Sequence, residues 1–382
     1  MMNKFKNITV SKITIFLFVL CIELIGVMNL KGLVDYYVYE KSPVSEWKPE
    51  MGDKLEADYS SVFWGKMQYV NLNGFCRKIL HQREMNGVIK LNNGYLAEVD
   101  TDSNTDIVIH NAQNVGELSQ WLEQNDIELL YVVTPDTISK YDMQLPEGIH
   151  DYTNQKLDRF VEQLEEENVQ YIDLRECIYE DGISQYDYFY KTDHHWNVRG
   201  GMYAAEKITE AVGELLEVVH DDTVWDDSNY QIDRYFEWHL GSRGQRVGRY
   251  FVGIDDFEIM YPKFETKINR KSDDMTGSFR DIFISYDALD NKNYASRYTY
   301  DRTYDCLTNR YINENALCNK KACILSDSMG RVVIPYLSLV FSEVDSIEEM
   351  TKGDIEKSMP DIVVILLHPM NVKQADYFDF GL

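Results

Sequence analysis

Residues 191–197 read Lys-Thr-Asp-His-His-Trp-Asn and place a carboxylate, two imidazoles and an indole on consecutive positions. Apolar residues at helical spacing follow this stretch and predict a helix from Val198 onward. Asn197 is suited to cap its first turn, and the glycine pair at 200–201 would let that turn pack closely. Titratable groups gathered on a short loop before a helix are typical of a functional site, with a solvated helix cap as the alternative.

A second polar motif follows an apolar run near the C-terminus. Residues 322–325 read Ala-Cys-Ile-Leu and predict a buried strand, and residues 326–330 read Ser-Asp-Ser-Met-Gly and predict a tight turn. A helix is expected over about 331–341. A serine at a strand-to-helix turn can be exposed at the sheet edge, beside backbone N–H groups and the helix dipole. The N–H groups of this turn, including that of Gly330, could hold the oxyanion of an acyl-transfer intermediate.

Together the two motifs contain the groups that a serine-dependent acyl transfer needs. The hydroxyl of Ser328 is a weak nucleophile at neutral pH and requires a positioned base. His195 could take its proton, while Asp193 could orient the imidazole and stabilise the imidazolium. Ser326 is a rival nucleophile in the same turn. We interpret His194 as a structural hydrogen-bonding residue, because a triad needs only one imidazole.

Strands and helices alternate along most of the chain after residue 107. Nearly continuous apolar strands in this alternation indicate an α/β fold, with a parallel sheet covered on both faces. Active sites of such sheets lie beyond the carboxyl ends of the strands, where both polar motifs are expected. Besides the elements above, we predict strands over 128–133, 170–174 and 362–367, and helices over 113–124 and 153–168.

Residues 220–320 interrupt the alternation. They are rich in Asp, Tyr, Arg and Asn and have no long apolar period, so we expect an irregular or β-rich insertion packed over the sheet. Within it, Arg243 and Arg246 in a glycine-rich loop could bind an acidic sugar or stabilise an oxyanion, and a solvated turn is an equally open interpretation. Upstream, residues 87–96 alternate apolar and polar residues around Asn-Gly signals and predict a β-hairpin.

The N-terminus is basic and leads into an apolar run over residues 13–30, which is long enough to span a bilayer. The positive flank favours a cytoplasmic N-terminus. No small-residue cleavage motif follows, so a membrane anchor over residues 1–34 is favoured over a cleaved signal peptide. We therefore expect a tether and lead-in over 35–75 and a catalytic domain over 76–382, on the extracytoplasmic side of the cell membrane.

Composition narrows the classes of function. A formal charge of −26 and a pI near 4.6 argue against binding to nucleic acid, which requires a basic face. The 27 tyrosines suit a surface that contacts carbohydrate rings, although tyrosine is also an ordinary structural residue. Six cysteines without a CxxC pair predict no cysteine-based metal site, and whether Cys306 and Cys318 pair stays open. No metal or organic cofactor is predicted.

A family resemblance rests on both polar motifs. The strings Thr-Asp-His-His-Trp at 192–196 and Ile-Leu-Ser-Asp-Ser at 324–328 resemble the DHHW proteins. Those proteins are related to the alginate O-acetylation proteins of the SGNH-hydrolase-like superfamily. The resemblance also takes in residues 87–96, 240–248 and 254–257.

The resemblance implies an α/β/α sandwich at the outer face of the membrane. It also implies a Ser–His–Asp triad, with the family positions falling on Ser328, His195 and Asp193. One departure is that the usual Gly-Asp-Ser block reads Ser-Asp-Ser here, so that Ser326 replaces a glycine in the turn.

The function implied by the resemblance is that of an O-acetyltransferase or acetylesterase acting on a cell-surface or exported polysaccharide, with a membrane-bound O-acyltransferase as partner. Two other classes stay open. A non-catalytic polysaccharide-binding or assembly subunit would have the same fold. The Asp-His-His string is also the signature of the DHH phosphoesterases, which bind two manganese ions, and Asp100 and Asp102 could then supply further ligands.

Overall fold

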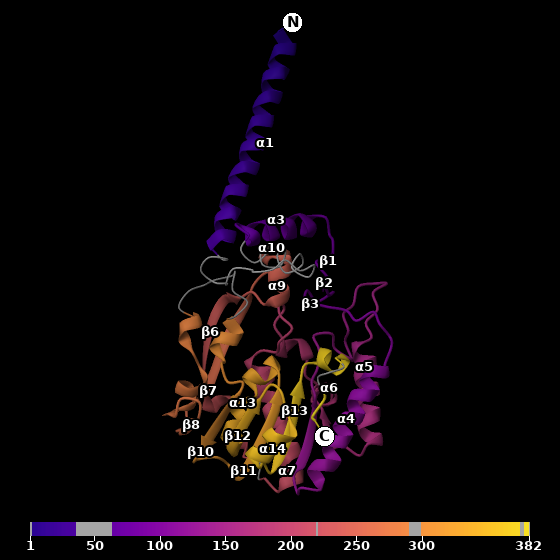
Figure 1. Cartoon of the computed structure of the whole chain (residues 1–382), viewed down its shortest axis with the longest axis vertical. Helices are drawn as coiled ribbons and strands as arrows, with labels where there is room; N and C mark the ends of the chain where they lie inside the picture. Colours follow the sequence, from indigo (N-terminus) through magenta and orange to yellow (C-terminus); the bar gives the residue numbers. More distant parts are fainter. Residues whose placement is uncertain (1, 36–62, 219–220, 290–298, 375–377, 382) are drawn as a thin grey trace, which may run out of the picture. The chain divides into compact units, whose positions relative to one another are not determined.

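The computed structural model describes residues 2–35, 63–218, 221–289, 299–374 and 378–381. They divide into two compact units, residues 1–73 and 74–382. The first unit contains the long helix α1 (Met2–Asp35), drawn in indigo in Figure 1. Its segment Lys12–Leu30 is the one helix in the described part of the chain that is long and apolar enough to cross a membrane, a property that signal sequences share. The expected tether falls mostly on residues 36–62, outside the described residues.

An eight-stranded sheet forms the centre of the second unit, with the strand order β5-β4-β13-β11-β12-β10-β8-β9. Its first five strands run parallel, as predicted, and the last three pair antiparallel. The parallel strands are β5 (Tyr171–Asp173), β4 (Glu128–Val133), β13 (Ile362–Leu367), β11 (Cys318–Ser326) and β12 (Phe341–Ile347), and the antiparallel ones are β10 (Asn309–Asn313), β8 (Ile268–Arg270) and β9 (Met275–Gly277).

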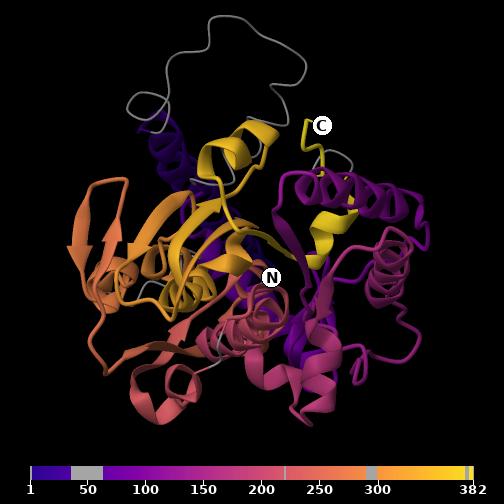
Figure 2. The ribbon, with the colours of Figure 1, turned by 90° about the horizontal axis from the view of Figure 1, so that it is seen from below.

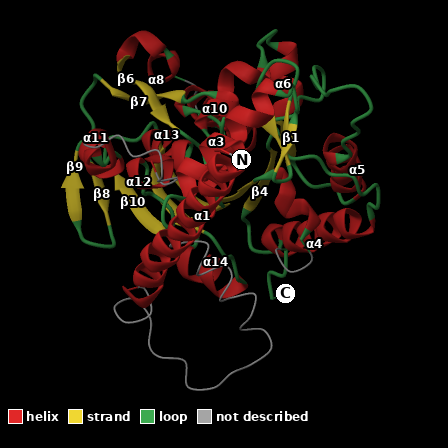
Figure 3. Ribbon diagram, turned by 90° about the horizontal axis from the view of Figure 1, so that it is seen from above, coloured by secondary structure: helices red, strands yellow, loops and turns green. Residues whose placement is uncertain are grey.

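Helices cover both faces of this sheet, because its central strands are apolar on both sides (Figures 2 and 3). Successive residues of a strand point to opposite faces, so Leu130 and Val132 of β4 enter one core while Leu129 and Tyr131 enter the other. The predicted α/β/α layering is therefore confirmed. One face carries α7 (Val198–Leu216) and α13 (Ile334–Val340), and the other carries α4 (Asp106–Glu123), α5 (Thr153–Glu166) and α14 (Lys352–Ser358).

The expected insertion over residues 220–320 packs over the sheet only in part. Its two long strands, β6 (Tyr230–His239) and β7 (Asp255–Pro262), form a separate antiparallel pair, as a β-rich insertion would. The strands β8, β9 and β10 instead extend the central sheet at one edge, which corrects the prediction. No apolar run marks β8 and β9, since each has three residues and only Ile268 is buried among them.

The hairpin predicted over 87–96 is present as β2 (Val88–Lys90) and β3 (Leu96–Ala97). A further strand, β1 (Glu84–Met85), pairs with β2 across the two-residue turn Asn86-Gly87. Both turn residues have positive φ, 54° and 72°, a conformation that asparagine and glycine adopt most readily.

Two helix boundaries differ from those predicted. Helix α4 begins at Asp106, seven residues before the expected start at 113, and the helix expected over 331–341 is divided. A 3₁₀ turn, η5 (Ser328–Val332), precedes α13, and Phe341 already starts β12. The remaining elements are α3 (Lys66–Ile79), α6 (Leu174–Glu180), η2 (Gln185–Tyr188), α8 (Asp222–Trp225), η3 (Asp227–Asn229), α9 (Ser242–Val247), α10 (Arg249–Val252), α11 (Phe279–Phe283), η4 (Tyr286–Leu289), α12 (Thr299–Thr303) and η6 (Pro369–Lys373).

The cysteines are all unpaired. Cys306 and Cys318 each lie against a backbone carbonyl, those of Arg331 at 3.3 Å and Val340 at 3.2 Å. The pairing left open by the sequence is therefore absent here, and both behave as small, partly or fully buried thiols.

Candidate active site

Three parallel strands of the sheet end at a common edge. The register pairs Ser326 of β11 with Leu366 of β13, and Leu367 of β13 with Val133 of β4. The residues that come next in β11 and β13 therefore lie together, and the backbone N–H of His368 donates to the side chain of Asp327 at 2.7 Å. Active sites of parallel sheets lie at this side of the sheet, beyond the carboxyl ends of the strands.

The loop before α7, residues 191–197, reaches this edge and is held there at its C-terminal end. Asn197 caps α7, as predicted, by accepting hydrogen bonds from the N–H groups of Arg199 and Gly200. The buried indole of Trp196 donates to the carbonyl of Met329, in the turn after β11, at 2.9 Å. A Cβ on Gly201 would lie 2.4 Å from the backbone oxygen of Val332, so the close packing expected at the glycine pair is present.

This packing brings the predicted nucleophile and base into contact. The Ser328 hydroxyl oxygen lies 2.7 Å from Nε2 of His195. Ser328 is partly exposed, whereas the His195 side chain is only 7% exposed. One face of the imidazole stacks on the ring of Tyr300, with a centroid separation of 4.4 Å and an interplanar angle of 18°. The ring orientation is thus fixed by packing as well as by hydrogen bonding.

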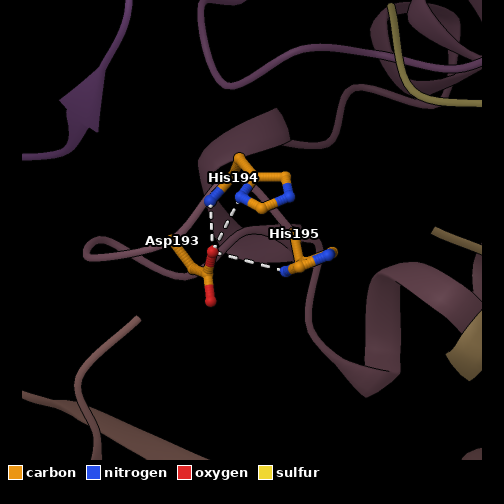
Figure 4. Close-up of side chains that lie close together, drawn as sticks. All are labelled: Asp193, His194 and His195. Atoms are coloured by element: carbon orange, nitrogen blue, oxygen red, sulfur yellow. Dashed lines mark hydrogen bonds and ion pairs between the residues drawn. The ribbon is translucent and has the colours of Figure 1, made fainter. Parts of the chain in front are cut away.

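Asp193 lies on the other side of the imidazole and is buried. Its Oδ1 lies 3.3 Å from Nδ1 of His195, and the two atoms are too poorly aligned for a good hydrogen bond. Figure 4 shows this oxygen facing both His195 and His194, whose backbone N–H donates to it at 2.7 Å. Catalytic contacts of this kind often tighten only when substrate binds.

Electrostatics favour an ionised Asp193 beside a neutral His195. Burial opposes ionisation of Asp193, but the positive charge that His195 has when it is protonated, together with hydrogen bonds from the surrounding imidazoles, outweighs it and holds the Asp193 pKa well below its usual range. Burial lowers the pKa of His195 below its ordinary value by more than the neighbouring Asp193 raises it. A neutral imidazole that accepts from Ser328 is the form that a general base requires.

Ser326 lies at the end of β11, fully buried beneath the turn. Its φ is not positive, so the glycine usual at this position is not required by the backbone. Space for its side chain exists because Gly330 has none: a Cβ on Gly330 would lie 2.2 Å from the Ser326 hydroxyl oxygen. The turn therefore presents Ser328, and not Ser326, to the surface.

The other predicted site residues have partners within the protein. The backbone N–H of Gly330 donates to the carbonyl of Asp327 at 3.0 Å, so it is not available to an oxyanion. His194 lies beside Asp193, with Nδ1 2.9 Å from the Ser242 hydroxyl and 3.0 Å from Oδ1 of Asp193, and its structural role stays a prediction.

Arg243 is buried, whereas Arg246 is exposed. The Arg243 guanidinium donates to the carbonyls of Leu96 and Asp193 and to the hydroxyl of Thr137. Arg246 donates to Glu98 at 2.5 Å and to the carbonyl of Asn86 at 2.6 Å. Arg243 thus connects β3 to the loop at 191–197, whereas Arg246 connects α9 to Glu98 and to the turn between β1 and β2.

Sequence reasoning did not single out His239, the last residue of β6. Its Nε2 lies 2.9 Å from Oδ2 of Asp193, and its side chain is completely buried. Ser242, three residues on, donates its hydroxyl to Oδ1 at 2.8 Å. The sequence signal that could have pointed to His239 was its position directly before residues 240–248, a stretch that is part of the family resemblance.

Asp193, His194 and His195 also lie close enough together to contact one cation, with ligand atoms within 4.8 Å of one another. Asp100, which could supply a further ligand in the two-manganese interpretation, pairs with the ammonium groups of Lys156 and Lys373, each at 2.9 Å. That carboxylate already has two cationic partners, so it is not poised to bind a metal ion.

Part of the chain matches a described protein family. Residues 95–223 match the family described as "SGNH hydrolase-like domain, acetyltransferase AlgX", a range that includes β4, α7 and the loop between 191 and 197. Comparison with curated proteins gave no match.

Solved structures share the fold over most of the chain. Bacillus cereus PatB1 is similar with a TM-score of 0.62 at 18% identity, covering 77% of this chain and 99% of its own. The structure of PatB1 with a sulfonyl adduct gives 0.61 at 20% identity, covering 78% and 99%. A DHHW family protein from Eubacterium siraeum gives 0.58 at 16% identity, covering 78% and 96%. Residues 95–223 are therefore similar to the SGNH-hydrolase-like domain of this acetyltransferase family, and the chain shares its fold with PatB1 and a DHHW family protein, in line with the resemblance of its two polar motifs.

Proposed function

We propose that this protein is an extracytoplasmic, serine-dependent O-acetyltransferase or acetylesterase that acts on a cell-surface or exported polysaccharide. The observation that carries the proposal is the 2.7 Å contact between the Ser328 hydroxyl and Nε2 of His195, with Asp193 on the far side of the ring. The match of residues 95–223 to an acetyltransferase family supports the reaction class.

The reaction proceeds in two acyl transfers. Ser328 Oγ attacks the acetyl carbonyl carbon while its proton passes to Nε2 of His195, which gives a tetrahedral oxyanion. Collapse of this intermediate breaks the bond to the donor oxygen, and that oxygen takes the proton from His195. A sugar hydroxyl, or water in an esterase, then gives its proton to His195 and attacks the acetyl group, and Ser328 departs with the proton. Ionised Asp193 stabilises the imidazolium in both steps.

The backbone N–H of Ser328 is the oxyanion donor that we propose. It makes no hydrogen bond to any residue that the structure describes, whereas the N–H of Met329 donates to the Asp327 side chain at 2.8 Å. Ser328 also begins the 3₁₀ turn η5, where backbone N–H groups lack partners within the turn. An N–H in this position contributes stabilisation only where negative charge develops.

We also propose that Lys12–Leu30 anchors the protein with its catalytic domain outside the cytoplasm, since basic residues precede the span. A membrane-bound O-acyltransferase that supplies acetyl groups is proposed as the partner, on the resemblance alone. The domain boundaries at residues 34 and 75 stay predictions.

Covalent labelling tests the nucleophile. We expect the full chain in detergent to gain one sulfonyl group on Ser328 when treated with phenylmethylsulfonyl fluoride, located by mass spectrometry of the tryptic peptide. His195→Ala is expected to slow the labelling by about 100-fold or more, because the hydroxyl then lacks its base. EDTA should change neither the labelling nor the hydrolysis of p-nitrophenyl acetate.

Two outcomes would contradict the proposal. Hydrolysis that EDTA abolishes and that proceeds without labelling of Ser328 would favour the metal-dependent alternative. A folded protein that shows neither labelling nor hydrolysis would favour a polysaccharide-binding or assembly subunit.

The pH dependence of hydrolysis tests the base. Only neutral His195 can accept the serine proton, so kcat/KM should fall as the pH drops through the His195 pKa. Burial lowers that pKa below the ordinary 6.5, so the plateau should persist to a pH lower than a free imidazole would allow. Rates measured between about pH 4.5 and 8 should give an acid limb with an apparent pKa below 6.5. An acid limb at or above pH 7 would show that the titrating group is not this imidazole.

A further inference from the structure

The carboxylate of Asp193 receives hydrogen bonds on both oxygens, from different segments of the chain. Oδ1 accepts from the His194 N–H at 2.7 Å and from the Ser242 hydroxyl at 2.8 Å. Oδ2 accepts from Nε2 of His239 at 2.9 Å, its one hydrogen-bond donor within the described residues. Because the side chain of Asp193 is buried, removing that donor would leave a charged oxygen unpaired.

His239 reaches Asp193 from outside the central sheet. It is the last residue of β6, and the chain beyond it turns closely around the carboxylate. A Cβ on Gly241 would lie 2.3 Å from Cβ of Asp193 and 2.6 Å from Oδ2, so this approach requires a glycine. The insertion between α7 and the final strands thus completes the surroundings of the aspartate.

The protonation of His239 follows from its partner. A carboxylate only accepts hydrogen bonds, so the proton of a neutral imidazole must be on Nε2. Nδ1 is then an acceptor, buried without a hydrogen-bond partner among the described residues. The remaining neighbours are the rings of Tyr190 and Phe257, with centroids at 4.7 and 5.7 Å, and the carboxylate of Asp255, the residue opposite in β7. Asp255 itself accepts from the N–H and hydroxyl of Thr192.

A buried acceptor without a donor costs stability, and an aromatic ring without nitrogens would fill the same space at no such cost. Packing alone therefore does not account for an imidazole at position 239. The hydrogen bond from Nε2 to Asp193 does.

We propose that His239 is a positioning residue of the acyl-transfer site, one that holds Oδ2 of Asp193 so that Oδ1 faces His195. The inference rests on the proposed function and extends it by one residue. The hydrogen bond fixes the rotation of the carboxylate and disperses its negative charge. Without it, the charge of Asp193 acts more fully on His195, and the carboxylate is held only by the two donors to Oδ1.

Two substitutions at this position separate positioning from packing. His239→Phe retains a buried ring and removes the donor, whereas His239→Gln places an amide N–H near the former Nε2. For the full chain in detergent, we expect His239→Phe to lower kcat for p-nitrophenyl acetate by about 10- to 100-fold with little change in KM. Its acid limb should move to higher pH, because a less dispersed negative charge raises the pKa of His195. His239→Gln should restore both the rate and the acid limb in large part.

Tyr190→Phe is the matched control. It lies against the His239 ring and loses only a buried hydroxyl that has no hydrogen-bond partner among the described residues, so kcat and the acid limb should stay at wild-type values. Thermal melts of all variants show whether each is folded under the assay conditions.

Two results would overturn the inference. One is a His239→Phe variant whose acid limb is unchanged, and the other is a His239→Gln variant that is folded yet as impaired as His239→Phe. If Ser328→Ala abolishes hydrolysis while His239→Phe has no effect, the positioning role alone fails. If neither substitution has an effect, the proposed function fails with it.

Discussion

Replacing Ser328 by alanine is expected to lower kcat for p-nitrophenyl acetate hydrolysis by about 10³-fold or more, because the covalent route is lost and only residual stabilisation by the site remains. The loss should be one of chemistry and not of folding. The Ser328 hydroxyl contacts only His195 in the described structure, so the melting temperature should change by no more than a few degrees. The measurement is a steady-state assay on the full chain in detergent, with the melt recorded in the same buffer.

Ser326→Ala is the matched control for this substitution. This substitution also removes a serine hydroxyl, two residues earlier in the chain. That hydroxyl is fully buried and has no hydrogen-bond partner among the described residues. Its kcat should stay close to that of the wild type. A Ser326→Ala variant that loses activity while Ser328→Ala retains it would exchange the two roles and refute the nucleophile that we propose.

Asp193→Asn is expected to reduce kcat by about 10³- to 10⁴-fold, although it alters the shape of the side chain hardly at all. An amide places two N–H donors where the aspartate has an acceptor. If the amide nitrogen faces His195, the imidazole must carry its proton on Nε2 and can no longer accept from Ser328. If it faces His239 instead, the two groups meet donor to donor unless His239 also changes tautomer. Either arrangement disturbs the base, and kcat measured with the same ester reports it.

A suitable control is Asp100→Asn, which removes a carboxylate charge elsewhere in the domain. Asp100 pairs with Lys156 and Lys373, so the variant should be less stable but should keep its kcat. The metal-dependent alternative makes the opposite prediction, since it would use Asp100 as a ligand. Loss of activity in both variants, reversed by added Mn²⁺, would therefore contradict the serine mechanism.

The central strands of the sheet were predictable because they are buried on both faces. Residues 128–133 and 362–367 are apolar almost throughout, and the structure has strands at those bounds. The start of α7 was predictable for a local reason too, since Asn197 caps it through its own side chain.

The strands from β12 outward to β9 were not predictable in the same way. The sequence of β12 is Phe-Ser-Glu-Val-Asp-Ser-Ile. Its buried residues are separated by partly exposed polar ones, so no continuous apolar run distinguishes this strand from the end of the helix predicted over 331–341. β8 and β9 become strands through pairing with β10 and with each other, a property of tertiary structure that no local pattern records.

In the candidate site, too, some residues are marked by a local sequence pattern and others are not. Asp193, His195 and Ser328 stand out because each lies in a local string of polar residues next to an apolar element. His239 makes its contact with Asp193 across 46 residues and comes from a strand with no distinctive pattern of its own. Contacts of this kind depend on how β6 and its following loop return to the sheet, which the sequence alone did not reveal.

The order of strands has a consequence for when the protein becomes active. β13, the last strand of the chain, lies between β4 and β11 and pairs with both. The base and the nucleophile are 133 residues apart, and the nucleophile follows β11, which pairs with that strand. A growing chain therefore lacks the strand that joins the two halves of its sheet until about residue 367 has been made. Activity should arise only after this strand has been made, so that a chain interrupted before it is chemically inert.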